Sequence, residues 1–372
     1  MSASVRMLLV LSLLLLFFVR DAAAEIASSA SPLQSPRWRQ GVNLPAEGWR
    51  ELHAALACWT DPTGRWVRNP EPWRLMNRRT LRKQTGTNKT TTAVHPAVTW
   101  VWQPRADCQY PYLPWDQGAF CAALRGRSVL AVGDSMSRQF HQTLEDLAAP
   151  GVGAPCTGRG FGAGTCRGHV ICGPGSGGGQ RVRLLWRRSD RLRIDFRRRF
   201  ELKANFGEEQ WVAESAAFRI IVLNRGAHFE ADGLLLRQLR TTLAYLTADR
   251  RDALVLVRTT PPGHPRCAGV HAPLKRYDPP LSLPFHWGEF ERQNAAVRAM
   301  LAAEYPGVLL LDVAPSTAMR ADSHLLGSRG RDCLHYKIPG PLDEWARLLF
   351  NALHLADTLE AQHRAGGVAR MP

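Results

Sequence analysis

Short, wholly apolar runs alternate with stretches of helical periodicity through most of the chain beyond residue 126. Such runs are typical of strands buried on both faces of a parallel sheet. They are Val129–Val132, Ile220–Leu223, Leu254–Val257 and Val308–Leu311. Helical spacing follows each strand, from Met136 to Leu147, over Leu234–Leu246, over Phe290–Glu304 and from Pro341 onwards. Alternation of this kind predicts an α/β fold with three layers, α/β/α, around a parallel sheet.

The chain before this region lacks such periodicity. Residues 58–125 carry three cysteines and many tryptophans and prolines, which predicts a smaller, disulfide-tied N-terminal lobe. Residues 126–362 are then expected to form the main domain, followed by a short tail, 363–372. In open sheets of this kind, functional sites lie at the carboxyl ends of the strands. The side chains expected there are Ser135, Asn224, Thr259 and Asp312.

Two stretches interrupt the strand and helix pattern of the main domain. Residues 151–179 are rich in glycine and hold three cysteines, which predicts an irregular loop held by disulfides. Residues 181–203 alternate apolar residues with arginines about a Ser189-Asp190 turn, which predicts a hairpin. Its arginine face can bind an acidic polymer, although such faces are more often only solvated.

The N-terminus has the pattern of a targeting segment. Arg6 precedes the apolar stretch Met7–Val19, and three alanines, 22–24, offer a small-residue cleavage site. We expect residues 1–24 to be a signal peptide and 25–57 a linker. A short signal anchor, the membrane contact this reading leaves open, is less favoured because Arg20 and Asp21 end the stretch abruptly. The protein is therefore expected in the secretory pathway.

Eight cysteines in an oxidising compartment favour disulfides. They are Cys58, Cys108, Cys121, Cys156, Cys166, Cys172, Cys267 and Cys333. His264, Cys267 and His271 do not have the spacing of a zinc motif, so a disulfide with ordinary histidines is the favoured interpretation and no metal is expected. The sequon at Asn88 predicts a glycosylated surface loop.

The chain carries a net charge of +16, most of it from arginine. No nucleic-acid-binding motif accompanies this charge, and the predicted compartment excludes nucleic acid as a partner. A polyanionic glycan is one partner that such a surface suits. A generally basic surface without a specific partner explains the charge equally well.

One constellation of side chains has the composition of an acyl-transfer site. Ser135 follows a predicted strand and begins a helix, so its backbone N–H can stabilise a developing oxyanion. A serine hydroxyl needs a neighbouring base, which His335 can supply. Asp332, three residues earlier, can hold the His335 ring in the correct tautomer. The alternatives are a helix-capping serine and an ordinary surface loop.

Further residues are expected around this constellation. Asn224 can be a second oxyanion donor, with Gly133 and Gly226 allowing tight turns beside it. His228 either approaches the site or has a structural role. Asp134 is interpreted as a turn-forming carboxylate that accepts hydrogen bonds from the backbone.

The stretches GDSMSRQ and DCLHYKIPGPLDEW resemble the PC-esterase family, which includes the plant trichome-birefringence-like proteins, within the SGNH (GDSL-type) hydrolase fold. Five further blocks are similar and occur in the family's order: CWTDPTGRWV (58–67), WVWQPRADC (100–108), LRGRSVLAVGDSMSRQ (124–139), NRGAH (224–228) and RTTPPGHPRC (258–267). The resemblance thus covers roughly residues 58–355 in pieces, without the glycine-rich middle.

The resemblance implies a covalent double displacement, in which Ser135 carries an acetyl group, His335 is base and then acid, and Asp332 orients it. Transfer to a sugar makes the protein a polysaccharide O-acetyltransferase of the Golgi lumen. Transfer to water makes it a secreted carbohydrate acetylesterase. A glycan-binding protein with an inactive site, using Trp100, Trp102 and Trp115, is the non-enzymatic alternative. An acetyl donor is required, and no cofactor is expected.

The sequence also departs from the family pattern. Land-plant members follow the histidine with Trp-Cys, whereas this chain has Tyr336-Lys337, and they carry paired tryptophans where it has Phe229-Glu230. These differences favour a distant, algal-type member and leave the polysaccharide open. The family's second-block glycine matches Gly158, Gly160 or Gly162 equally well. A Cys267–Cys333 disulfide is expected to brace the segment from Asp332 to His335, while the other pairings stay open.

Overall fold

The computed structural model describes residues 41–69, 99–148, 152–153, 166–173, 180–192, 211–249, 252–278, 283–326 and 332–368. All of them belong to one compact unit, residues 39–372. The expected signal segment, the Asn88 sequon, Cys156, the three alternative second-block glycines and residues 369–372 lie outside the described residues.

A seven-stranded sheet lies at the centre of the described chain, in the order β4-β5-β6-β3-β7-β8-β9. The five strands from β6 to β9 pair in parallel, while β5 pairs antiparallel with both β4 and β6. The strands are β3 (Val129–Gly133), β4 (Val152–Gly153), β5 (Cys166–Ile171), β6 (Val182–Arg188), β7 (Ile220–Asn224), β8 (Leu254–Arg258) and β9 (Leu309–Leu311). The predicted α/β class with a mostly parallel sheet is therefore confirmed.

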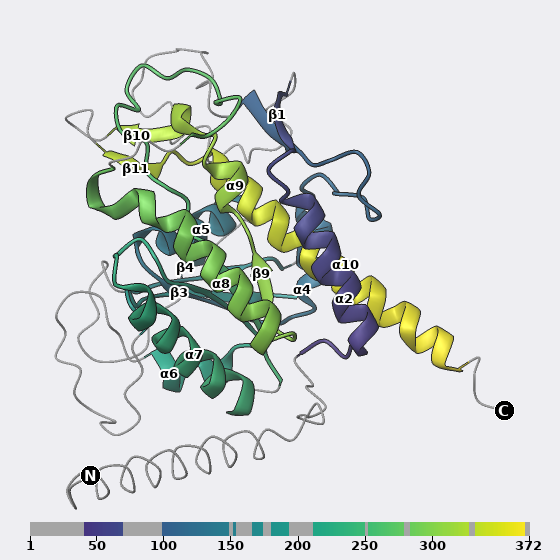
Figure 1. Cartoon of the computed structure of the whole chain (residues 1–372). Helices are drawn as coiled ribbons and strands as arrows, with labels where there is room; N and C mark the ends of the chain where they lie inside the picture. Colours follow the sequence, from purple (N-terminus) through teal and green to yellow (C-terminus); the bar gives the residue numbers. More distant parts are fainter. Residues whose placement is uncertain are drawn as a thin grey trace, which may run out of the picture. The chain divides into compact units, whose positions relative to one another are not determined.

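Successive side chains of the central strands enter two separate hydrophobic clusters, because neighbouring residues of a strand point to opposite faces. Val129, Ile220 and Leu256 pack with helices α2 (Ala46–Trp59), α4 (Gln117–Leu124), α5 (Ser135–Leu147) and α10 (Pro341–Val368). Their strand neighbours pack with α6 (Trp211–Glu214), α7 (Asp232–Asp249) and α8 (Phe290–Glu304) on the other face. Figure 1 shows α7 and α8 side by side over the sheet. This arrangement is compatible with a three-layer α/β/α fold.

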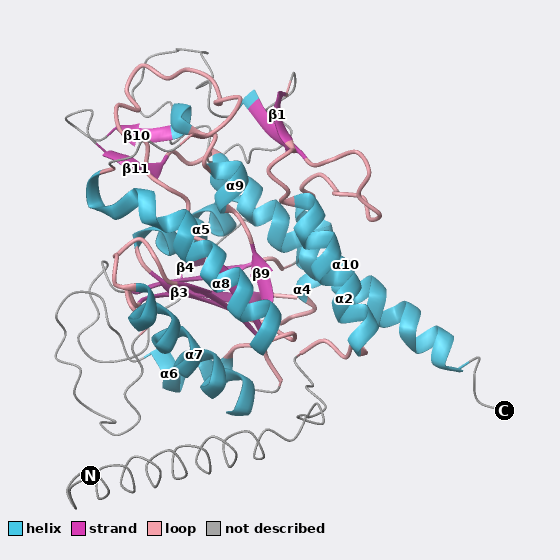
Figure 2. Cartoon of the chain, in the orientation of Figure 1, coloured by secondary structure: helices cyan, strands magenta, loops and turns pink. Residues whose placement is uncertain are grey.

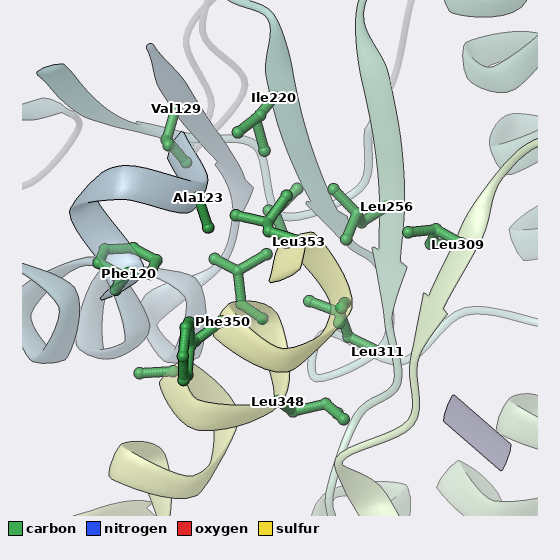
Figure 3. Close-up of a cluster of buried hydrophobic side chains, with 14 of the residues drawn as sticks. Phe120, Ala123, Val129, Ile220, Leu256, Leu309, Leu311, Leu348, Phe350 and Leu353 are labelled. Atoms are coloured by element: carbon green, nitrogen blue, oxygen red, sulfur yellow. The ribbon is translucent and has the colours of Figure 1, made fainter. Parts of the chain in front are cut away.

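Helix α10 provides the largest part of the first cluster. It begins at Pro341, whose missing N–H is tolerated in a first helical turn. Leu348 and Leu353 of this helix lie opposite Leu256 of β8 and Leu311 of β9 (Figure 3). The helix thereby covers the centre of the sheet and also contacts α2, α4 and α5.

Figure 2 shows β1, β10 and β11 apart from the strands of the central sheet. Two antiparallel pairs are formed by β1 with β2 and by β10 with β11. The bounds are β1 (Arg65–Arg68), β2 (Trp100–Gln103), η3 (Ser215–Ala217), η4 (Pro284–Glu289), α9 (Ala314–Thr317), η5 (Ala321–Ser323), β10 (His324–Leu326) and β11 (Asp332–Tyr336). No helix among the described residues has the length and apolarity needed to cross a membrane.

Two predictions about the middle of the chain are wrong. Residues 166–171 were expected in an irregular loop but form strand β5. Strand β6 was expected to pair in a hairpin with the residues after Ser189-Asp190, but it pairs with the preceding β5 on one side and with β3 on the other. Both edges of β6 are therefore occupied. Strand β6 is buried along most of its length, and Arg187, which is 1% exposed, is paired to Glu214.

The segment expected to form the N-terminal lobe packs closely on the sheet domain. Helix α2 occupies the end of the segment expected as a linker and shares the first hydrophobic cluster with α10. Disulfides join Cys58 to Cys108 and Cys121 to Cys172. Cys58–Cys108 closes the α2–β1–β2 region, and Cys121–Cys172 fixes α4 beside the end of β5.

Arg347 of α10 holds residues 102–113 through their backbone. Its guanidinium donates hydrogen bonds to the carbonyl oxygens of Leu113 (2.7 Å), Trp102 (3.0 Å) and Tyr112 (2.9 Å). It also lies over the Tyr112 ring, 4.0 Å from the centroid. Tyr112 and Leu113 belong to a segment without regular structure, so for their carbonyls Arg347 replaces the partners that a helix or sheet would have supplied.

We predict that Arg347→Met lowers the free energy of unfolding by about 3 kcal/mol, because three partly buried carbonyls lose a charged donor. Chemical denaturation measures this change. Arg364→Met is the control on the same helix, since the Arg364 side chain is 66% exposed. Equal losses in the two variants would contradict the proposed role of Arg347.

Candidate active site

Ser135 lies where strand β3 passes into helix α5. Asp134 is the N-cap of that helix, and its Oδ1 accepts hydrogen bonds from the N–H groups of Met136 (2.9 Å) and Ser137 (3.4 Å). The interpretation of Asp134 as a turn-forming carboxylate is confirmed. Ser135 occupies the first helical position, where a backbone N–H has no acceptor within the helix. That N–H is available to a substrate oxygen.

Gly133 is required at the end of β3 by its surroundings. Its φ is +154°, and a Cβ there would contact the Ser137 hydroxyl and lie 3.1 Å from the Asn224 carbonyl oxygen. Any side chain would push β3 away from β7. The glycine therefore allows the strand end to approach Asn224 closely.

His335 connects Ser135 with Asp332. Its Nε2 lies 2.7 Å from Ser135 Oγ, and its Nδ1 lies 3.0 Å from Asp332 Oδ2 and 3.1 Å from Oδ1. The carboxylate accepts a hydrogen bond from the Nδ1–H group, which leaves the Nε2 lone pair facing the serine hydroxyl. The three residues are thus joined in a continuous hydrogen-bonded chain. Ser135 begins α5 and Asp332 begins β11, and the two residues lie 197 positions apart in the sequence.

Asp332 is ionised at neutral pH. Partial burial acts to raise its pKa, but the His335 backbone N–H, the charge of His335, the His335 ring and the Leu334 N–H together lower that pKa below its ordinary value. Two of these hydrogen bonds come from within β11, at 3.0 Å from His335 and 3.3 Å from Leu334. The Asp-x-x-His spacing therefore orients both the carboxylate and the imidazole locally.

Strand β11 is braced by covalent and backbone contacts. A disulfide joins Cys267 to Cys333, the pairing expected from the resemblance. The His264 N–H donates to the Cys333 carbonyl oxygen at 2.9 Å. Because Cys267 is disulfide-bonded, it is not a metal ligand with His264 and His271. The disulfide is attached to strand β11 at Cys333, the residue directly after Asp332.

Gln139 joins this strand to helix α5. Its side-chain amide donates to the Tyr336 carbonyl oxygen at 2.6 Å and accepts from the Tyr336 N–H at 3.2 Å. Gln139 is four residues after Ser135, so both lie on the same face of α5. The amide thereby fixes the residue after His335 at one helical turn from the serine. Sequence reasoning missed Gln139, although its spacing from Ser135 was the available signal.

Arg258 at the end of β8 lies behind the serine turn. It is 1% exposed, lies 4.5 Å from the centroid of the Trp345 ring, and donates to Ser137 Oγ at 3.3 Å. Burial lowers the pKa of Arg258 to about 10, while the charge of Asp134 acts in the opposite direction. The guanidinium stays protonated and balances the buried carboxylate of Asp134. The sequence did not single out this arginine.

Asn224 is close to the serine turn, but its amide hydrogens are engaged. Its Nδ2 donates to the Arg258 carbonyl oxygen and to Thr260 Oγ1, both at 3.0 Å. Gly226 was expected to allow a tight turn. Instead, it gives the Thr260 side chain room, because a Cβ at this position would collide with that side chain. A role for Asn224 as an oxyanion donor stays a prediction and requires it to exchange one of these bonds.

His228 lies in a charged group beside the serine turn. Its Nε2 lies 3.4 Å from the Asp190 carboxylate, which also pairs with Arg188 at 3.0 Å. Arg188 is in register with Gly133 on the neighbouring strand. The His228 side chain is 44% exposed, so this group borders the site at the surface. Phe229 and Glu230, which replace the family's tryptophans, stack on His286 and pair with Arg225.

Two buried imidazoles, those of His264 and His324, contact the backbone of strand β11. His264 Nδ1 lies 2.7 Å from His324 Nε2, and the outer nitrogens face carbonyl oxygens of Ala318 (2.6 Å) and His335 (3.1 Å). Burial lowers the pKa of both rings, that of His324 to about 3 with a further contribution from His264. Two neutral rings carry only two N–H hydrogens, so no more than two of these three contacts are hydrogen bonds at one time.

A cavity of about 970 Å³ opens near these residues. Its lining includes Arg65, Lys275, Tyr277, Trp287 and Asp312. Ser135, Asp332 and His335 are not among the described residues that line it. Its wall includes Pro262, whose carbonyl oxygen accepts a hydrogen bond from the Tyr336 hydroxyl. The cavity is therefore connected to the residue that follows His335.

The tryptophans considered for glycan binding differ in burial. Trp102 is 2% exposed and donates from Nε1 to the Trp59 carbonyl oxygen, so it packs inside the protein. Trp115 is half-buried and contacts the rings of Phe120 and Phe350. Trp100 is also half-buried. Glycan binding by these residues stays a prediction.

The comparisons with known proteins are limited in extent. None of the known family models matches the chain. A stretch of 79 residues is 35% identical to Protein trichome birefringence-like 42 of Arabidopsis thaliana. This stretch resembles a trichome birefringence-like protein. The match covers 20% of this chain, which spans about a fifth (22%) of the length of that curated relative. The match points to the same family as the sequence motifs, but only over part of the chain. Because the coverage is small, the activity of this protein is a proposal.

We predict that His324 makes folding sensitive to acid. The unfolded His324 has a pKa of about 6.5, so as pH falls from there towards 3 the unfolded state binds a proton that the folded state does not. Stability is therefore lost on acidification, by about 2 kcal/mol at pH 5 from this residue. Denaturant titrations of the wild type and His324→Gln should show a shallower pH slope in the variant.

The exposed His354 provides the control for this measurement. His354→Gln should keep the wild-type slope between neutral pH and pH 5. Identical slopes in all three proteins would show that His324 titrates normally in the folded state.

Proposed function

We propose that the protein is a serine acyltransferase of the SGNH type that moves an acetyl group to a glycan hydroxyl. The observation that supports this most strongly is the 2.7 Å contact between Ser135 Oγ and His335 Nε2, with Asp332 on the opposite ring nitrogen. These distances match a nucleophile, a base and an orienting carboxylate. The partial similarity to a trichome birefringence-like protein supports the same reaction class.

The first half-reaction forms an acetyl-serine. Ser135 Oγ attacks the carbonyl carbon of an acetyl ester while its proton passes to His335 Nε2, and Asp332 stabilises the resulting imidazolium. The Ser135 backbone N–H stabilises the oxyanion at the helix N-terminus. The donor's leaving oxygen then takes the proton from His335 as its bond to the acetyl carbon breaks.

The second half-reaction reverses these proton movements. A sugar hydroxyl gives its proton to His335 Nε2 and attacks the acetyl-serine, which releases Ser135 Oγ and returns the proton to it. Water reacting in place of the sugar would make the protein an acetylesterase. The same residues serve both outcomes, and the motifs' resemblance to transferases favours transfer.

The cavity beside Tyr336 has features that suit a sugar chain. Tyr277 lies in its wall, and the basic Arg65, Lys275 and Arg276 line it together with the acidic Asp61, Glu291 and Asp312. A glycan that carries carboxylates is the acceptor class that we favour. Three disulfides among the described residues fit the secretory pathway, and we place the reaction in the Golgi lumen.

The experiment that tests this function is intact-mass measurement after incubation with an activated acetyl ester. We expect wild-type protein to gain one acetyl group and Ser135→Ala to gain none. Adding oligosaccharides, neutral and uronate-containing, should discharge the adduct with formation of acetylated sugar. Discharge at the same rate with and without sugar identifies an esterase. No adduct and no ester turnover would leave the enzymatic proposal without support.

We predict that Gln139→Leu lowers kcat for ester turnover by about 10- to 100-fold with little change in KM, because His335 is no longer held at the distance needed for proton transfer. Gln139→Glu should lose less, since it keeps the acceptor for the Tyr336 N–H. Gln142→Leu on the same helix is the control. An unchanged kcat in Gln139→Leu, with a native melting temperature, would show that the hydrogen bonds between Gln139 and the Tyr336 backbone are not needed for turnover.

A further inference from the structure

Three potential metal ligands converge at the far end of helix α5, away from the serine. His141 and Glu145 are four residues apart, so they lie on one face of the helix. His169 reaches the same point from strand β5. One ligand atom from each of the three side chains lies within 4.8 Å of the others. Sequence reasoning did not connect these residues, because His169 falls in the glycine-rich stretch that was expected to be irregular.

The His141 ring is buried without the partners that a buried imidazole needs. It is 0% exposed, and neither ring nitrogen has a partner with full hydrogen-bond geometry among the described residues, although the Leu184 backbone lies close enough to act on the pKa of the ring. His169 Nδ1 is also buried and without a partner in that part of the chain. Buried polar groups are almost always satisfied, so three unsatisfied imidazole nitrogens at one point call for a ligand.

The charges around this group act on its members. Burial and the neighbouring His169 lower the pKa of His141, while the charge of Glu145 acts in the opposite direction. For Glu145, partial burial acts to raise the pKa, but the hydrogen bond from His169 and the charge of Arg167 lower it below its ordinary value.

Arg167 pairs with the Glu145 carboxylate and fixes its orientation. It donates to Glu145 Oε2 at 3.0 Å, while Glu145 Oε1 lies 3.0 Å from His169 Nε2. The carboxylate thus has one oxygen held by Arg167 and one oxygen directed at the histidines. An outer hydrogen bond of this kind orients a ligating carboxylate.

From this geometry, we propose that His141, Glu145 and His169 form a binding site for a divalent transition-metal ion of the zinc class. Two neutral imidazoles and one carboxylate are a donor set that suits Zn²⁺, with a fourth position left for water. His141 is six residues from Ser135, about 9 Å along the helix at 1.5 Å per residue. The ion would therefore fix α5 to strand β5 and have no part in acyl transfer.

The test uses the full-length protein, freed of metal by a chelator and titrated with Co²⁺, whose visible absorption reports coordination by nitrogen and oxygen ligands. We expect saturation at one Co²⁺ per chain, displacement by Zn²⁺, and a higher melting temperature with Zn²⁺. His169→Gln should bind Co²⁺ at least about ten-fold more weakly and lose the thermal shift. His169 is the residue of choice because it is less buried than His141.

His354→Gln controls for binding to exposed histidines and should behave as the wild type. If the wild type shows no saturable Co²⁺ spectrum, or if His169→Gln retains wild-type affinity, the site does not exist as proposed. Ester turnover by the metal-free protein is measured in parallel. Because the proposed acyl chemistry does not use the ion, failure of one proposal is distinguishable from failure of the other.

Discussion

The placement of helix α5 is the constraint on which the candidate site depends. Its first residue is Ser135, so any shift of the helix moves this serine relative to His335. The buried Asp134 carboxylate fixes the first turn, and Gln139 holds strand β11 against the same turn. Near the other end of the helix, Glu145 binds Arg167 and His169 of strand β5. The helix is thus held near its start to strand β11 and near its end to strand β5.

Buried charge is the second feature that organises this region. Parallel strands bury both of their faces, so a carboxylate such as Asp134 at a strand end is withdrawn from water. Arg258, stacked on Trp345, supplies the opposite charge from β8, two strands away from β3, without exposing the turn to solvent. A cation held against an aromatic face keeps its orientation, which makes the serine turn rigid before a substrate arrives.

The elements with a strong local pattern could be predicted from the sequence, and those that depend on distant partners could not. The runs at Val129, Ile220 and Leu254 are apolar throughout, and only a strand covered on both faces needs that composition. The Asp332–His335 spacing was readable because both groups lie in one short segment. Strand β5 escaped prediction because its Arg, Gly and His residues are neutralised by contacts with α5 and β6 that no local pattern reveals. Arg258 and Gln139 were missed for the same reason, since their partners are 121 and 197 residues away.

The bond between Gln139 and β11 recognises only backbone atoms, the N–H and the carbonyl oxygen of Tyr336. No part of the Tyr336 side chain takes part in it. The Tyr336 side chain is held separately, because it is fully buried, stacks on the His324 ring, and donates from its hydroxyl to the Pro262 carbonyl oxygen. The residue after His335 is therefore fixed twice, through its backbone by Gln139 and through its ring by the wall of the cavity. A movement of that wall at Pro262 would be passed to His335 through this one residue.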